Sequence, residues 1–572
     1  MLKYLKKYRA ECVCAPLFKM LEALLDLLVP LVVASIIDRG IDGGDPGHVW
    51  RMCGLLIALG LVGLAAAVTA QYFAAKAATG FAADVRHTLF ENLTGLSFPD
   101  VDRVGVPAMI TRMTSDVNQA QTGVNMALRL LLRSPFVVLG AMGMAFTIDA
   151  RCALIFLAVI VALGTVVAVI MAVNIPMMRG VQRQLEAVLA ATRENLTGAR
   201  VIRAFRREDA QYQAFREKNR ELTARQRRAG RVSALLNPAT YVLINAAVIV
   251  LVRQGAIRVD SGALTTGAVV ALYNYMSQIL VELIKFASLT VTINKAWASW
   301  KRIEDALALK PSMTSPDRLS GAVDPAAPAV EFRNVSLTYP GAGSPSLEDV
   351  SFAAMPGQTV GIIGGTGSGK SSVAGLIPRF YEATAGQVLV NGVDVRRWPQ
   401  AALRQKVGVV LQRAMLFKGS IRDNLLWGRP DAPDDALVAV AESAQAADVL
   451  AVKGGLDGLI EQNGGNLSGG QKQRLTIARA LARRPEILIL DDSASALDMA
   501  TDARLRRAIA HLDYRPTVFI ISQRTASIMG ADLILVLDDG RVVGKGTHAE
   551  LLERCPVYRE IYDSQFGRGA AV

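Results

Sequence analysis

Six long apolar segments in the first 309 residues limit what this chain can fold into. Each is close to the roughly 20 residues that an α-helix needs to cross a bilayer, and no segment of comparable length follows them. They predict a membrane domain with six spans, whose two ends lie on the same side of the membrane. The segments cover residues 13–37, 51–76, 127–147, 152–175, 235–253 and 265–289.

The links between these segments alternate in length and charge. Short links cover residues 38–50, 148–151 and 254–264, whereas long links cover residues 77–126 and 176–234. The second long link is rich in arginine, and cytoplasmic links carry the excess of Lys and Arg in membrane proteins. The long links and both termini are therefore predicted to lie in the cytosol.

The long links are predicted to be helical extensions of the membrane spans. They contain good helix formers and few breakers, and a helix of about 40 residues is about 60 Å long, roughly twice the hydrocarbon thickness. Each link has one punctuated stretch where the chain can reverse, at 97–107 and around 197–209. We expect these two elbows to dock a cytosolic domain. The basic amphipathic stretch from Met1 to Arg9 is predicted to lie on the cytoplasmic membrane surface.

The composition and net charge of the chain limit what it can be expected to bind. Of 572 residues, 52% are hydrophobic, and the net charge is +13, which suits either nucleic acid or an anionic membrane face. No aromatic stacking platform interleaves the arginines, so membrane lipid is the predicted partner and nucleic acid is not. Cysteines form no CxxC pair or His/Cys cluster, so neither a disulfide framework nor a zinc site is expected. They are Cys12, Cys14, Cys53, Cys152 and Cys555.

A second domain follows the membrane part. Residues 1–309 form the predicted transmembrane domain, and residues 310–328 are rich in Pro, Ser and Asp without periodicity, which is typical of a linker. Residues 329–566 alternate short apolar strands with helical segments, which predicts an α/β domain. A short tail at 567–572 ends the chain. The expected strands include 360–364, 388–392, 407–412, 487–492 and 517–522.

The most informative run in the second domain is GGTGSGKS, which matches G-x-x-x-x-G-K-[ST] between a predicted strand and a predicted helix. Its glycines let backbone N–H groups turn towards phosphate oxygens, Lys370 can meet the β- and γ-phosphates, and Ser371 can bind Mg²⁺. The domain is therefore predicted to bind ATP or GTP. The residues expected at the nucleotide are Gly364, Gly365, Thr366, Gly367, Ser368, Gly369, Lys370, Ser371 and Ser372.

Two further motifs suit the same chemistry. Asp491 and Asp492 end an apolar strand, where Asp491 is placed to hold Mg²⁺ as the second acidic element of a P-loop site. The run LSGGQ precedes a helix, and its amides, hydroxyl and helix N-terminus form a second phosphate-binding surface. One domain needs only one such surface for its nucleotide, so this run is predicted to serve an ATP held by a facing domain. Its residues are Ser468, Gly469, Gly470 and Gln471.

With these motifs, the whole chain resembles one half of an ATP-binding cassette exporter of the type IV architecture. The resemblance implies an α-helical six-span transmembrane domain followed by an α/β P-loop NTPase domain, with ATP and Mg²⁺ as ligands. Tyr339 resembles the aromatic residue that stacks on adenine, and Gln412 the glutamine that senses Mg²⁺. Ser371, Gln412 and Asp491 would be the Mg²⁺ ligands. Residues 495–498 resemble the loop that crosses to the opposite site, and the two elbows resemble the helices that couple the domains.

Two positions depart from the family pattern. Asp492 stands where the family has glutamate, and Gln523 stands where it has the switch histidine. A general base needs a carboxylate within reach of the attacking water, and aspartate is about 1 Å shorter than glutamate. Glutamine can donate a hydrogen bond to a γ-phosphate but cannot shuttle a proton. With the intact LSGGQ run and the segment YREIYDSQFG, this pairing resembles the degenerate-site subunit of bacterial heterodimeric multidrug exporters.

That resemblance implies catalytic positions at Asp492 and Gln523 that bind ATP firmly and hydrolyse it slowly. It also implies a second half-transporter as partner, an amphipathic small-molecule cargo, and a place in the cytoplasmic membrane of a bacterium. Three functions stay open: a heterodimeric exporter of drugs or lipids, a transporter of the same fold with a dedicated cargo, and a regulatory ATP-binding subunit. A dedicated cargo could be a peptide, a lipid, or a siderophore or haem-related molecule.

Ionisable residues inside the predicted spans have two explanations. Glu22 and Asp26 lie one turn apart in the first span, and Glu282 and Lys285 are three residues apart in the sixth. They could line a cavity and attract cationic cargo. Alternatively, Glu282 pairs with Lys285, and the other two lie near headgroups or bond to another helix. Arg129 and Arg133 in the third span have the same ambiguity.

Overall fold

The computed structural model describes residues 1–567 and divides the chain into two compact units. The first unit comprises residues 1–94 and 107–309, and the second comprises residues 95–106 together with the chain from 310 onward. The predicted tail at 567–572 lies, apart from its first residue, outside the described residues.

The first unit is entirely helical, and six of its helices are long and apolar enough to cross a membrane. Each of the six predicted segments falls within one of them, except that the sixth begins one residue early, at 265, so the prediction of six spans is confirmed. The six helices run over Leu2–Ile41, Pro46–Thr94, Val106–Ile148, Ala150–Thr197, Glu208–Asp260 and Thr266–Leu307.

Local irregularities divide these long helices into shorter elements. Two short π-helical segments occur at Ile36–Ile41 and Arg112–Asp116. The α-helices are α1 (Leu2–Leu5), α2 (Arg9–Ser35), α3 (Pro46–Thr94), α4 (Phe98–Val104), α5 (Val106–Thr111), α6 (Val117–Leu130), α7 (Arg133–Ile148), α8 (Ala150–Thr197), α9 (Ala199–Ala204), α10 (Glu208–Ala234), α11 (Leu236–Asp260) and α12 (Thr266–Leu307).

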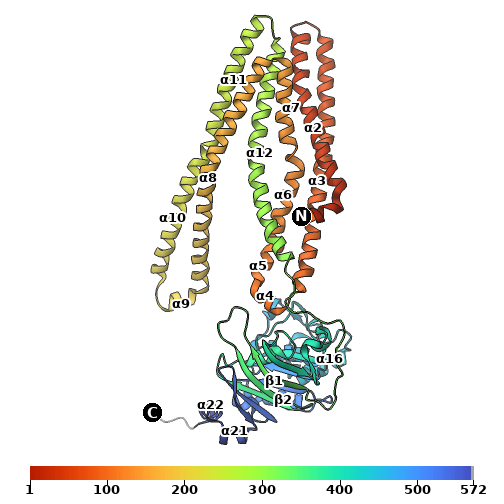
Figure 1. Ribbon diagram of the computed structural model, residues 1–572, viewed down its shortest axis with the longest axis vertical. Coiled ribbons are helices and arrows are strands. Elements are labelled where there is room, and N and C mark those ends of the chain that lie inside the picture. The colour runs from red at the N-terminus through yellow and green to blue at the C-terminus, as the bar shows by residue number, and fades with distance from the viewer. Residues whose placement is uncertain (568–572) are drawn as a thin grey trace. The chain divides into compact units, whose positions relative to one another are not determined.

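The helices extend well beyond the length of a span, as the long links predicted. With 49 residues, α3 measures about 73 Å at 1.5 Å per residue, more than twice the hydrocarbon thickness. Helices α2, α3, α6, α7 and α12 pack together, whereas α8 and α10 pair as a hairpin that reverses at α9 (Figure 1). The second predicted elbow is therefore the tip of this hairpin.

The short links are shorter than the sequence predicted. The chain remains helical to Ile41 and resumes at Pro46, so the first link is four residues rather than the predicted 38–50. Likewise α11 continues to Asp260, inside the predicted link 254–264. The Asp, Gly and Pro residues suggested an earlier break. Intrahelical bonding satisfies the backbone close to the membrane, where water is scarce, and Pro46 is tolerated because it stands at the first position of its helix.

The N-terminal residues pack onto the helical bundle. The Tyr4 ring lies edge-on to Phe81 and Trp300, with ring centroids 6.4 and 6.1 Å apart. These contacts place α1 against α3 and α12. The amphipathic pattern of residues 1–9 therefore includes a face that contacts protein, in addition to the predicted membrane-facing surface.

The charged residues inside the spans pair with one another. Arg133 of α7 bonds to Asp26 of α2 and to Glu282 of α12, and Glu282 also accepts from Lys285. The predicted pairing of Glu282 with Lys285 is found. The partner of Asp26 is an arginine on another helix, which the sequence named without assigning it a partner.

The second unit contains three sheets. A six-stranded sheet has the order β12-β11-β3-β10-β9-β6, in which only β12 is antiparallel, and a four-stranded antiparallel sheet has the order β2-β1-β4-β5. The strands are β1 (Val330–Leu337), β2 (Leu347–Ala354), β3 (Thr359–Gly364), β4 (Ala385–Val390), β5 (Val393–Asp394), β6 (Val407–Val410), β7 (Gly419–Ser420), β8 (Leu459–Ile460), β9 (Ile487–Asp491), β10 (Thr517–Ile521), β11 (Leu533–Asp538) and β12 (Arg541–Gly546).

Helices cover the parallel sheet, which is why β9 and β10 are buried along their whole length and read as continuous apolar runs. All five expected strands occur, as β3, β4, β6, β9 and β10. The sequence did not identify the antiparallel sheet as a separate layer. The helices are α13 (Lys370–Leu376), α14 (Gln400–Lys406), α15 (Ile421–Leu426), α16 (Asp434–Ser443), α17 (Ala447–Lys453), α18 (Gly469–Ala482), α19 (Met499–Ala510), α20 (Thr525–Ile528), α21 (His548–Arg554) and α22 (Pro556–Phe566).

The first predicted elbow, α4, belongs to the second unit. The ring of Phe98 stacks on Phe380 with centroids 4.4 Å apart, and the Tyr381 hydroxyl donates to Asp102 at 2.6 Å. Asp100 is buried and accepts from the backbone N–H of Ser312 at 2.8 Å. These apolar and polar contacts hold α4, about two turns of helix from the long link, on the α/β unit.

Helix α6 approaches α12 closely at Gly123, where an added Cβ would overlap the Cβ of Ala296. We expect Gly123→Ala to destabilise the protein by about 1–3 kcal/mol, because the two helices must separate. Thermal unfolding of the purified protein, followed by fluorescence, measures the effect. Gly143→Ala is the matched control, since an added Cβ there meets open space. Equal unfolding temperatures for the two variants would contradict the prediction.

Candidate nucleotide-binding site

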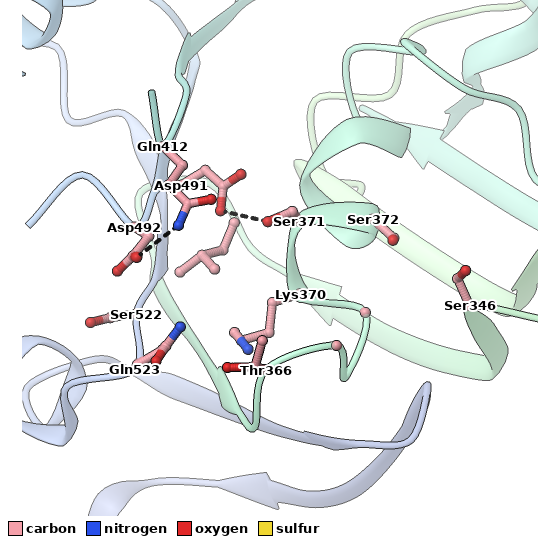
Figure 2. A pocket seen from close by; sticks show the side chains of 13 residues that line it. Ser346, Thr366, Lys370, Ser371, Ser372, Gln412, Asp491, Asp492, Ser522 and Gln523 are labelled. Atoms are coloured by element: carbon pink, nitrogen blue, oxygen red, sulfur yellow. Dashed lines mark hydrogen bonds between the residues drawn. The ribbon is translucent and has the colours of Figure 1, made fainter. Parts of the chain in front are cut away.

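A cavity of about 260 Å³ lies beside the end of β3 and collects residues from five separate parts of the second unit (Figure 2). The strands β3, β9 and β10 are parallel neighbours, so their carboxyl ends meet at one edge of the sheet, where ligands bind in open α/β folds. The lining residues are Ser346, Thr366, Gly367, Gly369, Lys370, Ser371, Ser372, Gln412, Asp491, Asp492, Ile521, Ser522 and Gln523.

The loop after β3 requires glycine for two physical reasons. Gly367 and Gly369 have φ angles of +86° and +94°, which residues other than glycine rarely adopt. An added Cβ on Gly369 would lie 2.6 Å from the carbonyl oxygen of Ser346, and one on Gly364 would overlap the carbonyl oxygen of Leu537. Only with glycine at these positions can the loop adopt the conformation in which its backbone N–H groups point towards a ligand.

Lys370 begins α13 and folds back over this loop. Its Nζ donates to the carbonyl oxygens of Gly364 and Gly365, at 2.9 and 2.5 Å. Burial lowers the pKa of Lys370, and the nearby Asp492 and Asp491 offset this only in part. A partly buried ammonium that has only neutral hydrogen-bond partners fits an anionic ligand such as a phosphate group.

Ser371 and Asp491 meet across the cavity. The Ser371 hydroxyl donates to Oδ1 of Asp491 at 3.0 Å, and Asp491 is buried at the end of β9. Burial raises the pKa of Asp491, and neighbouring Asp492 adds to the effect. Two hard oxygen atoms suit Mg²⁺, which keeps waters and substrate oxygens as its other ligands. Among the described residues, no group of three or more His, Cys, Asp or Glu side chains could hold a metal ion.

Asp492 lies beside the same cavity in a constrained backbone position. Its φ angle is +46°, and its N–H donates to the carbonyl oxygen of Ile521 at 2.9 Å. Nε2 of Gln412 donates to Oδ2 of Asp492 at 3.3 Å (Figure 2). Burial raises the pKa of Asp492, against the opposing effect of this hydrogen bond. Of the three predicted Mg²⁺ ligands, Ser371 and Asp491 therefore bond to each other, whereas Gln412 bonds to Asp492.

Gln523 follows β10, and its exposed side chain lies across the cavity from Thr366 and Lys370 (Figure 2). Its backbone is held by a residue that sequence analysis missed. Gln565 of α22 donates through Nε2 to the carbonyl oxygen of Gln523 at 2.7 Å, and its Oε1 accepts from the N–H of Thr525 at 2.8 Å. One amide side chain thus fixes both ends of this turn.

Arg524 was also missed. Its guanidinium donates to the carbonyl oxygens of Ala494, Ser495 and Leu497, at 3.3, 3.2 and 3.1 Å. It ties the turn after β10 to the loop 495–498. Gln565 lies within the segment YREIYDSQFG, but no motif assigns a role to it or to Arg524, because both act on backbone atoms that any residue type supplies.

The LSGGQ run is not part of this cavity. The Ser468 hydroxyl accepts from the N–H of Gln471 at 3.3 Å, and Oε1 of Gln471 accepts from the N–H of Ser468 at 2.9 Å, so the pair caps α18. Ser468 and Gly470 instead line a separate, open hollow of about 770 Å³ with Leu497 and Asp498. The two predicted phosphate-binding surfaces of the chain are therefore distinct.

Tyr339 lies next to the P-loop without lining the cavity. Its hydroxyl donates to Oγ of Ser372 at 3.0 Å, and its ring meets Tyr381 edge-on, with centroids 5.0 Å apart. Ser368 is buried, and Gly365 has open space around it. Tyr339, Gly364, Gly365 and Ser368 thus support or flank the loop, whereas the other predicted P-loop residues face the cavity.

A six-span helical unit joined to a P-loop α/β unit defines a membrane transport ATPase. The sequence matches the family described as "ABC transporter transmembrane region" over residues 12–283 and the family described as "ABC transporter" over residues 347–495. The chain belongs to the ABC transporter family. ATP binding follows from this membership.

The relatives span the whole chain. An uncharacterized ABC transporter ATP-binding protein, YfiB of Bacillus subtilis, is 35% identical and covers 99% of this chain, with 98% of its own length matched. The ATP-dependent lipid A-core flippase of Albidiferax ferrireducens is 30% identical, covering 98% of this chain and 97% of its own length. The putative multidrug export ATP-binding/permease protein YgaD of B. subtilis is 28% identical, covering 99% and 98%.

A solved structure has the same fold. The ATP-bound structure of a bacterial Atm1-family ABC exporter superposes with a TM-score of 0.81 over 98% of this chain and 99% of its own chain. At 23% identity, this likeness shows the fold.

Because the pKa of Asp491 is raised above that of the same carboxyl in the unfolded chain, the free energy of unfolding falls as pH rises through the window between the two values. At neutral pH the ionised carboxylate therefore destabilises the nucleotide-free protein. We expect Asp491→Asn to raise its unfolding temperature, by about 2–4 °C per kcal/mol relieved, and to abolish the further stabilisation by ATP with Mg²⁺. Thermal unfolding with and without both ligands measures this.

Asp435→Asn, on the exposed first turn of α16, is the matched control and should change neither value. A lower unfolding temperature for the nucleotide-free Asp491 variant would contradict the prediction.

Proposed function

We propose that this chain is one half of a heterodimeric exporter that moves amphipathic small molecules, drugs or lipids, out of a bacterium across its cytoplasmic membrane. The ATP-binding unit and both termini lie in the cytosol, as the arginine-rich long link favours. Relatives named for multidrug export and for lipid A-core flipping support this cargo class.

The observation that carries the proposal is the separation of two phosphate-binding surfaces in one chain. Lys370 and Asp491 line one cavity, and Ser468 lines another, open one. A nucleotide held at Lys370 lacks an LSGGQ run beside it, and the LSGGQ run at Ser468 lacks a nucleotide. A second cassette facing this one supplies both missing parts.

The α8–α10 hairpin also favours a partner. Val201 of its tip, α9, and Phe205, which directly follows α9, are both exposed, and Phe205 is 74% exposed. A large exposed aromatic on a projecting arm is typical of an interaction site. We assign this tip to the cassette of the second half-transporter.

Within its own site, this chain holds ATP and hydrolyses it slowly. Lys370 and the P-loop amides bind the phosphates, Tyr339 contacts the base, and Ser371, Gln412 and Asp491 orient Mg²⁺. When bound, ATP supplies the phosphoanhydride bond whose hydrolysis resets the transporter. Asp492 offers a carboxylate that is one methylene short for a general base, and Gln523 offers a hydrogen-bond donor without a transferable proton.

The proposal is tested by the ATPase rate of this chain alone and with a second half-transporter that carries the family glutamate and histidine. We expect hydrolysis to be slow alone and to rise on mixing, because the Ser468 loop completes the partner's competent site. Ser468→Ala should remove that gain. Brisk hydrolysis by this chain alone would overturn the assignment of a degenerate site, and ATP binding that no cargo or partner converts to turnover would indicate a regulatory subunit.

The roles of Asp492 and Gln523 predict a gain of function. We expect Asp492→Glu combined with Gln523→His to raise hydrolysis by this chain between about tenfold and a hundredfold, because a carboxylate displaced by about 1 Å can cost that much. Steady-state phosphate release measures it. The same pair combined with Lys370→Ala is the control and should bind no ATP. An unchanged rate with intact ATP binding would rule out the assigned roles.

A further inference from the structure

Six charged side chains form a network of ion pairs, here called the charge network, inside the membrane unit. Arg133 of α7 lies at its centre, with Nη1 at 2.5 Å from Oε1 of Glu282 and Nη2 at 3.0 Å from Oδ2 of Asp26. Lys285 donates to Glu282 at 2.9 Å. Lys19 and Glu22 complete the set, through a contact of 2.5 Å between them and one of 3.8 Å from Glu22 to Arg133. The network contains three cations and three carboxylates, so its formal charges sum to zero.

The side chains of the charge network differ sharply in their solvent exposure. The side chains of Arg133 and Glu282 are only 11% and 5% exposed, whereas those of Asp26 and Lys285 are 46% and 47% exposed. Charged groups within membrane helices do not face lipid but a water-filled cavity or another protein surface. The two half-exposed members of this network are therefore a carboxylate, Asp26, and an ammonium, Lys285, and the buried Arg133 and Glu282 lie between them.

Two buried polar groups near Asp26 have hydrogen-bonding capacity that no described residue uses. Nε of Arg133 and Oε1 of Gln278 are buried, and neither has a hydrogen-bond partner among the residues that the structure describes. Gln278 lies on α12 one turn before Glu282, and its Nε2 donates to the backbone carbonyl of Asp26 at 3.3 Å. Buried polar atoms without partners are uncommon, and each calls for a water or a ligand group.

An apolar cavity lies within one helical turn of Lys285, and Ile284 and Ser288 of α12 line it, although Lys285 itself does not. It measures about 300 Å³ and lies between α8, α11 and α12, with Val167, Met171, Leu236, Asn237, Ile284, Ser288 and Val291 as its lining. At about 100° per residue, Lys285 lies about 60° from Ser288 on the surface of α12, and about 60° from Glu282 on the other side. One path across α12 therefore passes from the apolar cavity to Lys285 and then to the buried ion pairs that lead to Asp26.

We infer that this path binds a zwitterionic amphiphile whose anionic group adjoins its apolar part and whose cationic group lies at the far end, as in a phosphocholine or phosphoethanolamine head. The apolar part fills the cavity, the anionic group pairs with Lys285, and the cationic group pairs with Asp26. A zwitterion with the opposite charge order places like charges together at both ends. This inference rests on the proposed export of amphipathic molecules and names its cargo class.

The test compares four amphiphiles that share a dodecyl chain: a phosphocholine, a sulfobetaine with its ammonium next to the chain, a trimethylammonium and a sulfate. Binding to the full-length protein in phosphatidylglycerol nanodiscs, without nucleotide, is measured by calorimetry against empty nanodiscs. We expect the phosphocholine to bind about tenfold or more tightly than each of the others, the effect of about one additional ion pair. Equal binding of the phosphocholine and the sulfobetaine would overturn the inference.

Two variants change the preference in opposite directions. Asp26→Asn removes the carboxylate but keeps the ammonium of Lys285, so it should shift the preference from the phosphocholine towards the sulfate. Lys285→Gln removes the ammonium but keeps the carboxylate of Asp26, so it should shift the preference towards the trimethylammonium. A shift that increases binding of one probe cannot come from misfolding. Lys295→Gln, an exposed position on the same helix, is the matched control and should keep the wild-type order. Loss of binding to all four probes by both variants would count against the inference.

The two proposals fail separately. If the four probes bind alike but any amphiphile stimulates ATP hydrolysis by the paired halves, the cargo class is wrong and amphiphile export stands. If the phosphocholine preference is found but no amphiphile stimulates hydrolysis, the site exists and the proposed export is wrong.

Discussion

The bilayer imposes the constraint on which the membrane unit depends, because the backbone polar groups of a spanning segment have no water to bond to. The chain meets this constraint with continuous helices, even where the sequence contains Asp, Gly and Pro near the turns. The same absence of water requires charged side chains in the spans to find partners. Arg133 provides one for Asp26 and Glu282 at once, and so joins α2, α7 and α12.

In the second unit the corresponding constraint is the parallel sheet. Its strands β3, β9 and β10 end at one edge, so Lys370, Asp491 and Gln523, which are far apart in the chain, face one cavity. That convergence has an energetic cost, since burial lowers the pKa of Lys370 and raises that of Asp491. A site that destabilises both charges without ligand gains from binding an anion and a cation together.

The turns around the cavity are held by side chains that act on the backbone. Arg524 fixes the loop 495–498, and Gln565 fixes the turn that carries Gln523. Through α4, a piece of the long membrane link is held to this unit by Phe98 and Asp100. Tyr381 lies against both Phe98 of α4 and Tyr339, whose hydroxyl donates to Ser372 of α13, so packed side chains connect α4 with the helix that follows the P-loop.

The sequence by itself determined the six spans, their helical extensions, the P-loop and its acidic partner, because these depend on local periodicity and on motifs whose chemistry needs fixed residue types. It also marked the departures at Asp492 and Gln523. The tertiary structure alone decided what depends on residues distant in the chain: the pairing of Asp26 with Arg133, and the positions of Gln565 and Arg524. Backbone acceptors and ion-pair partners carry no sequence signature, since many residue types could supply them, and only folding selects which ones meet.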